Sequence, residues 1–141
     1  MRLLFLPLLL LAGCGRDEPQ AVPTTEATPA GIAIYAAQGR DRLCLSAKAG
    51  EQAGLITFAA TGDANCSLRG SWTDGASAAI RPAGDPACTI PIESEGDVVT
   101  LGRPTPGCGY YCGPGATFEG KTFVRMDKPA PVTDFAGDPI C

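Results

Sequence analysis

Six cysteines in the second part of this 141-residue chain limit how the sequence can fold more than any other feature. They are Cys44, Cys66, Cys88, Cys108, Cys112 and Cys141. An even number of cysteines in a small exported domain is typical of a disulfide framework. Gly 18 and Pro 13 are also high counts, and they favour short elements joined by turns over long helices.

The first three of these cysteines are evenly spaced, and each begins a stretch of alternating polar and apolar residues: "CLSAKA", "CSLRGSW" and "CTIPIES". Further alternating stretches are "GLITFAA", "ASAAIRP" and "DVVTLGR". Alternation of this kind, broken by Gly, Asp, Asn and Pro, predicts an antiparallel meander. We therefore expect an all-β domain of about seven or eight short antiparallel strands, forming a small barrel or curled sheet stapled by disulfides.

The meander limits which cysteines can pair. In an up-and-down order, Cys44, Cys66 and Cys88 lie on alternate strands and enter from the same end. Alternate strands are nearly 10 Å apart, whereas a disulfide needs its Cα atoms within about 7 Å. We therefore expect each of the three to pair with one of the three later cysteines, and the choice of partner stays open.

An aspartate stands three residues before four of the cysteines: Asp41, Asp63, Asp85 and Asp138. In three of these places the sequence reads Gly-Asp-x-x-Cys, beginning at Gly62, Gly84 and Gly137. We interpret the pattern as a turn in which the aspartate accepts a backbone N–H and the cysteine is the first residue of the next strand. The alternative is a divalent-cation site formed if the four carboxylates converge. We expect no metal ligands.

The N-terminus reads "MRLLFLPLLLLAGCGRDEPQ". Its apolar run is far shorter than the roughly 20 residues of a spanning helix, and it is typical of a signal peptide, which we place at residues 1–13. The next stretch, "LAGC", resembles the lipobox of bacterial lipoproteins. The resemblance implies a lipid, including palmitate, on Cys14 and cleavage before it. Gly15 follows, and by the sorting rule of enteric bacteria this resembles an outer-membrane lipoprotein facing the periplasm.

The chain then divides into a tether and a domain. Residues 14–31 carry the lipidated cysteine and a segment rich in Pro, Thr and Ala, which has too little apolar surface to form a core. Residues 32–141 form the disulfide-rich β domain. The net charge of −4 and pI near 4.7 argue against nucleic acid as a partner. We expect the protein to be attached to the membrane through the lipid on Cys14.

The chain contains no histidine, so Ser-His-Asp and Cys-His catalysis and histidine metal ligands are excluded. A Ser-Lys pair is conceivable at Ser46 and Lys48, and a carboxylate pair at Glu93 and Glu95. Both pairs also suit a solvated strand face. We expect no enzymatic activity and no cofactor.

The densest segment is "GCGYYCGPGATFEGKTFVRM", residues 107–126. We predict a possible binding loop that includes Tyr110, Tyr111, Gly113, Gly115 and Phe118. Tyrosine offers a large contact area at low entropic cost. The alternative is structural, with one tyrosine ring in the core and the other over a disulfide. The end of the segment, residues 116–126, predicts a hairpin that turns at residues 120–121. Trp72, which lies outside this segment, is expected to be in the core or to plug the barrel.

Part of this segment resembles the membrane-bound inhibitors of c-type lysozyme, small periplasmic lipoproteins built on an antiparallel β-barrel. Their motif is Ser-Gly-x-Gly-Ala-x-Tyr, followed by a glycine turn and an aromatic strand ending near a lysine. The matching positions are Gly113, Gly115, Ala116, Phe118, Gly120, Phe123 and Lys128. Cys112 and Phe118 stand where the family has serine and tyrosine. The resemblance implies a polar loop that enters the lysozyme cleft.

Together these features predict a membrane-anchored lipoprotein of the bacterial cell envelope whose β domain is a non-catalytic module that binds a protein or a glycan. A periplasmic lysozyme inhibitor is the alternative, with lysozyme as the partner, and a cation-binding domain is the second alternative.

Overall fold

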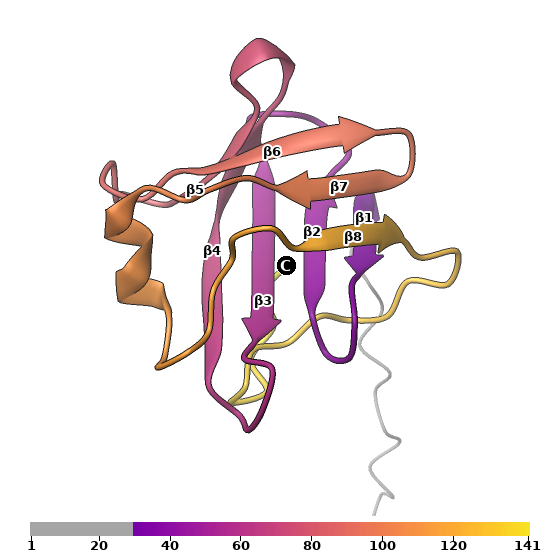
Figure 1. Ribbon diagram of the computed structural model, residues 1–141. Coiled ribbons are helices and arrows are strands. Elements are labelled where there is room, and N and C mark those ends of the chain that lie inside the picture. The colour runs from indigo at the N-terminus through magenta and orange to yellow at the C-terminus, as the bar shows by residue number, and fades with distance from the viewer. Residues whose placement is uncertain (1–29) are drawn as a thin grey trace, which may run out of the picture.

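A computed structural model describes residues 30–141, which form a closed barrel of antiparallel strands that follow one another around the barrel in chain order (Figure 1). The strands are β1 Ile32–Ala36, β2 Arg42–Ser46, β3 Gln52–Phe58, β4 Asn65–Thr73, β5 Ala79–Pro82, β6 Ile90–Glu95, β7 Val98–Leu101 and β8 Thr122–Arg125. Two 3-10 helices interrupt them: η1 Gly75–Ser77 and η2 Pro106–Tyr111. The all-β disulfide-stapled barrel predicted from the alternation is confirmed.

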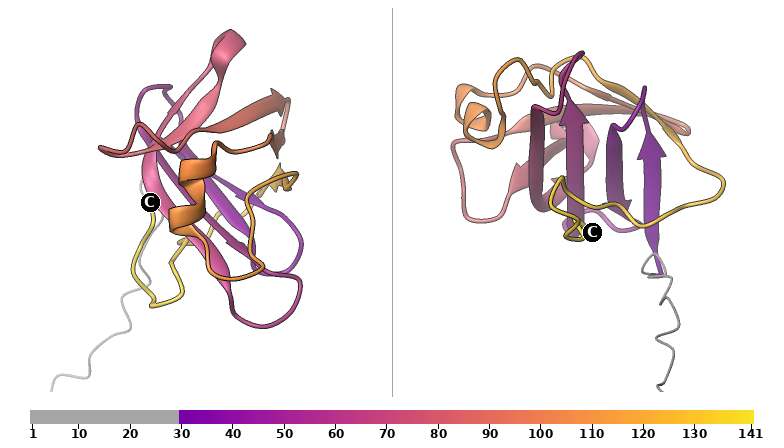
Figure 2. Two further views of the ribbon diagram at one scale, coloured as in Figure 1. Left: turned by 60° about the vertical axis from the view of Figure 1, so that its left-hand side comes forward. Right: turned by 90° about the horizontal axis from the view of Figure 1, so that it is seen from below.

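The barrel is flattened into two layers. Strands β1–β4 stand side by side, and β6–β8 cross over them at a steep angle (Figures 1 and 2). Alternate residues of each strand point inward, so Leu43 and Leu45 of β2 meet Leu55 of β3 and Phe123 of β8 in one buried cluster. Burying apolar surface contributes about 25 cal/mol per Å², and this cluster is the main stabilising core.

A second, smaller core lies outside the barrel wall. Ile34, Cys44 and Ile56 point outward from β1–β3, where Val132 and Ile140 of the C-terminal segment cover them. Gly54 allows this close approach, because a Cβ there would overlap the carbonyl oxygen of Ile140. The C-terminal segment is fixed further by the Cys44–Cys141 disulfide.

The disulfides join Cys44 to Cys141, Cys66 to Cys112 and Cys88 to Cys108, with Cα separations of 6.4, 3.9 and 4.5 Å. Each early cysteine therefore pairs with a late one, as the strand spacing predicts. Their positions in the strands differ from expectation. Cys44 is the third residue of β2, Cys66 the second of β4, and Cys88 precedes β6. The cysteines thus lie near the beginnings of these strands without starting them.

The expected hairpin within residues 116–126 is wrong. Residues 116–121 form no strand, and β8 pairs with β7 on one side and with β1 on the other. The ladder between β8 and β1 is short: Tyr35 faces Arg125 and Ala36 faces Val124. The aromatic strand therefore closes the barrel instead of forming a local hairpin.

Candidate functional site

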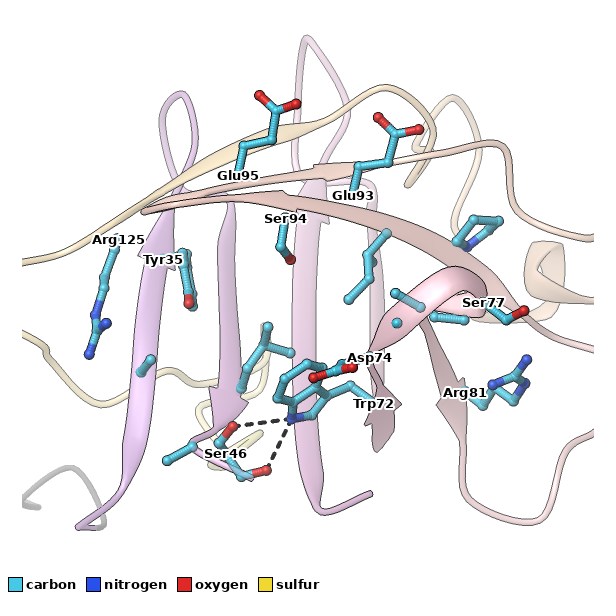
Figure 3. Close-up of a pocket in the computed structure, with 18 of the residues that line it drawn as sticks. Tyr35, Ser46, Trp72, Asp74, Ser77, Arg81, Glu93, Ser94, Glu95 and Arg125 are labelled. Atoms are coloured by element: carbon cyan, nitrogen blue, oxygen red, sulfur yellow. Dashed lines mark hydrogen bonds between the residues drawn. The ribbon is translucent and has the colours of Figure 1, made fainter. Parts of the chain in front are cut away.

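The candidate site is a cavity of about 1280 Å³ at one end of the barrel (Figure 3). Strands β2, β4, β6 and β8 all run toward this end, because alternate strands of an antiparallel barrel are parallel to one another. A residue at or near the end of each lines the cavity: Ser46, Trp72, Ser94 and Arg125. We call this the open end.

Trp72 lies at the base of the open end. Its ring is half-buried and packs against the main core. Its Nε1–H donates to the backbone oxygen and to Oγ of Ser46, each at 3.1 Å. Since both β2 and β4 end here, these bonds fix the indole between two strand ends. The ring presents one apolar surface to the cavity and is a lining group as well as a core group.

Tyr35 and Arg125 stand together on one side of the cavity (Figure 3). They are directly opposite residues of β1 and β8. Phe123 is fully buried in the core, so Arg125, two residues later, shares its inward-facing side of β8. Arg125 remains exposed to solvent because it is at the rim. A charged side chain is thus brought to an inward position beside a tyrosine.

The other side of the cavity is formed by the connection from β4 to β5. Asp74 is the N-cap residue of η1, but its side chain makes no capping hydrogen bond. Ser77, within the same helix, also lines the cavity. Ser94 points from β6 into the space, whereas Glu93 and Glu95 point away from it (Figure 3). The cavity therefore combines aromatic surface, hydroxyl groups and charges of both signs.

The opposite end of the barrel is closed by η2 and the chain that follows it. Cys88–Cys108 attaches the middle of η2 to the approach to β6, and Cys66–Cys112 attaches its end to β4. Further along, the Thr57 hydroxyl donates to the carbonyl of Thr117 at 2.9 Å. We call this the closed end.

The predicted binding loop forms this closed end, and its residues are not equally accessible. Phe118 is 1% exposed and belongs to the core, so it cannot contact a partner. Gly113 donates its N–H to the carbonyl of Asn65 as part of the packing on β4. Gly115 has a φ of 77°, a turn conformation that favours glycine.

The two tyrosines of this loop have separate roles. Tyr110 is 88% exposed, and its ring packs edge-on against Tyr111, with centroids 5.3 Å apart. Tyr111 is half-buried against the core, and its hydroxyl donates to Oδ2 of Asp85 at 2.8 Å. That hydrogen bond, followed by desolvation, raises the pKa of Tyr111. Tyr111 thus packs against the core, close to what the structural alternative expected of one ring, and Tyr110 is the more exposed of the two.

The four aspartates before the cysteines do not converge. Asp85 is the expected turn acceptor, since its Oδ1 accepts the Ala87 N–H at 2.8 Å. Asp41 is buried and accepts from the Phe58 N–H and from Nζ of Lys121, both at 2.8 Å. Asp63 forms an exposed ion pair with Arg40.

At the fourth of these positions, Asp134 accepts the N–H groups of Ala136 and Asp138, so it forms the turn instead of Asp138. The interpretation of all four aspartates as equivalent turns is therefore wrong. Within residues 30–141, no group of three or more His, Cys, Asp or Glu residues is placed to hold a metal ion.

The two pairs considered for catalysis, Ser46 with Lys48 and Glu93 with Glu95, are not arranged for it. Ser46 Oγ donates to the backbone oxygen of Lys48, while Lys48 Nζ lies 3.9 Å from Glu51. Glu93 and Glu95 point to solvent from the outer side of β6. The Ser46 hydroxyl and the Lys48 ammonium thus bond to groups other than each other, and the two glutamates do not face the cavity.

Neither a family model, nor a curated protein, nor a solved structure matches this chain. Among the described residues, no helix has the length and apolar character to cross a bilayer. Cys14, which the sequence predicts to carry a lipid, and the predicted signal peptide lie outside the described residues.

Proposed function

We propose that this chain is a lipid-anchored, non-catalytic binding module of the bacterial cell envelope that holds a glycan in the open end of its barrel. The observation that carries the proposal is the open-end cavity, in which Trp72 and Tyr35 accompany Ser46, Ser94 and Arg125. Ligand sites are typically concave, with an apolar or aromatic surface and a few converging polar groups.

The contents of the barrel favour a short polar ligand over a lipid chain. Leu45 and Ile92 lie directly beneath the cavity and are fully packed, and Leu55 and Phe123 fill the interior below them. The space is therefore an open cup and not a tunnel. A sugar suits such a cup because its C–H face packs on an indole while its hydroxyls bond to side chains around the rim.

Trp72 provides the test, since it is the single tryptophan of the chain. The mature domain is titrated with soluble glycan strands prepared from bacterial cell wall, and indole fluorescence is followed. We expect a saturable change in intensity or wavelength, confirmed by calorimetry. An unchanged spectrum together with no heat of binding would refute the glycan proposal.

A lysozyme inhibitor is a second candidate, favoured by the exposed Tyr110 on a helix held by two disulfides. A large aromatic side chain on a rigid support loses little entropy when a protein binds. The test is inhibition of c-type lysozyme by the purified domain at equimolar concentration. The candidate predicts inhibition that Tyr110→Ala weakens, and absence of inhibition excludes it.

Anchoring is tested separately by metabolic labelling with radioactive palmitate. We expect label in the native protein and none in Cys14→Ser, which lacks the acceptor thiol. Equal labelling of both proteins would contradict the lipoprotein assignment.

A further inference from the structure

The charges at the open end are arranged as a pair on opposite sides. Arg125 ends β8 and Asp74 follows β4. In an eight-stranded barrel β4 and β8 are separated by three strands in either direction, so they face each other across the barrel. Figure 3 shows Arg125 with Tyr35 on one side of the cavity, and Asp74 with Trp72 further across it.

Neither charge is neutralised by the protein. Within residues 30–141, ion pairs closer than 4.0 Å involve other residues and include neither Arg125 nor Asp74. Arg81, the other cation around the cavity, donates to the hydroxyl of Thr73 at 3.4 Å. Arg125 and Asp74 thus keep their capacity for charge-assisted hydrogen bonds.

The strand register places Arg125 on the inward-facing side of β8. A residue on the inward side of a small barrel is ordinarily apolar, as Phe123 is on the same strand. Arg125 follows on that side and is the strand partner of Tyr35, which also lines the cavity (Figure 3). A guanidinium with a neighbouring phenol is a suitable receptor for a carboxylate, which accepts two parallel hydrogen bonds from arginine.

The other acidic residues near the rim do not neutralise Arg125. Glu93 and Glu95 line the edge of the cavity but direct their carboxylates outward. Asp97 and Asp127 lie in a neighbouring hollow of about 300 Å³ that also reaches Arg125, yet neither forms an ion pair with it. These carboxylates weaken the attraction for anions at long range, so a ligand anion needs direct contact with the guanidinium.

We infer that the open end selects a glycan that carries both a carboxylate and an ammonium group, as a peptide-substituted glycan does. The carboxylate binds Arg125 and Tyr35, the ammonium group binds Asp74, and a sugar ring packs on Trp72. This inference rests on the proposed function and narrows its ligand class. It requires no covalent or redox step.

The experiment compares two soluble probes, a disaccharide-tetrapeptide from cell wall and a neutral chitotetraose, against four variants of the domain. Arg125→Gln and Asp74→Asn each remove one cavity charge. Arg103→Gln and Glu95→Gln are the matched controls, because Arg103 is paired with Glu119 in the chain that follows β7 and Glu95 points outward. All four side chains are exposed, so thermal melts should show native stability.

We expect Arg125→Gln and Asp74→Asn each to weaken binding of the charged probe by about tenfold, the lower limit for a hydrogen bond to a charged group. The neutral probe should bind all variants equally. Equal binding of the charged probe by the native domain and both cavity variants would overturn the charge assignment while leaving glycan binding intact. Failure of both probes to bind the native domain would overturn the proposed function itself, and the inference with it.

Discussion

The two ends of the barrel are built from the two ends of the same strands, and they differ in what holds them. At the closed end, near the beginnings of β4 and β6, two disulfides attach η2. At the open end, where these strands finish, the wall is held by hydrogen bonds such as those from Trp72 to Ser46. The contrast shows how a small domain can concentrate covalent stabilisation in one place and leave the other accessible to a ligand.

Removing a disulfide of the closed end is the largest expected perturbation. The Cys66–Cys112 bond joins residues 46 apart, and the chain-entropy relation gives a loss of about 4 kcal/mol for a loop of that size. Urea unfolding of Cys66→Ala/Cys112→Ala measures it. Protein that is still folded should keep its glycan affinity, because the cavity lies at the other end. A parallel loss of affinity would show that the ends are not independent.

Asp41→Ala should cost about 3 kcal/mol, since it leaves the Phe58 N–H and the Lys121 ammonium without their buried acceptor. Asp63→Ala removes an aspartate from the same sequence pattern, but its side chain is 66% exposed, so the cost should stay below about 1 kcal/mol. Urea unfolding of both variants gives the comparison. Equal losses would mean that the two carboxylates have equivalent roles after all.

Trp72→Phe should change ligand binding at the open end and leave the closed end intact. The variant loses the hydrogen bond to Ser46, which is worth about 1 kcal/mol of stability, and it should weaken glycan binding by about tenfold through the loss of indole surface. Calorimetry is needed because the fluorophore is gone. Tyr110→Ala, at the closed end, serves as the control and should bind glycan normally. A comparable loss of affinity in this variant would place the glycan site at the closed end instead.

The smallest effect concerns pH at the closed end. The hydrogen bond to Asp85 raises the pKa of Tyr111 above its usual value of about 10. A pKa that is higher in the folded state means that this stabilisation is complete below about pH 10 and is lost as pH rises through the folded pKa. Absorbance titration should show Tyr111 ionising at lower pH in Asp85→Asn, with Tyr111→Phe identifying the signal. An unchanged titration would contradict the contact.

Much of the fold can be predicted from local patterns in the sequence. Leu43, Leu45 and Leu55 alternate with outward residues, and this period of two is enough to predict strands and an inward face. Separation of alternate strands is enough to require that early cysteines pair with late ones. The predicted hairpin is wrong because only Phe123 lies in a strand, whereas Phe118 fills the core from a loop.

The site was less predictable because it depends on contacts between distant residues. Arg125 becomes a cavity residue through the pairing of β8 with β1, and nothing local to either strand determines that register. One signal was available: Arg125 has the same parity as Phe123. Likewise Asp41 reads as a turn residue until Lys121, 80 positions away, reaches its carboxylate. Equal sequence motifs therefore acquired unequal structural roles.

The short ladder between β1 and β8 has a dynamic consequence. Its register covers Tyr35–Ala36 and Val124–Arg125, and the ladder between β5 and β6 is equally short, whereas β3 is paired with β4 along its whole length. Regions with little protecting structure open first in native-state fluctuations, so amide exchange with deuterium should be faster along this seam than along the ladder between β3 and β4. Opening there would separate Tyr35 from Arg125, widening the mouth for a larger ligand while exposing two strand edges on which another copy could pair.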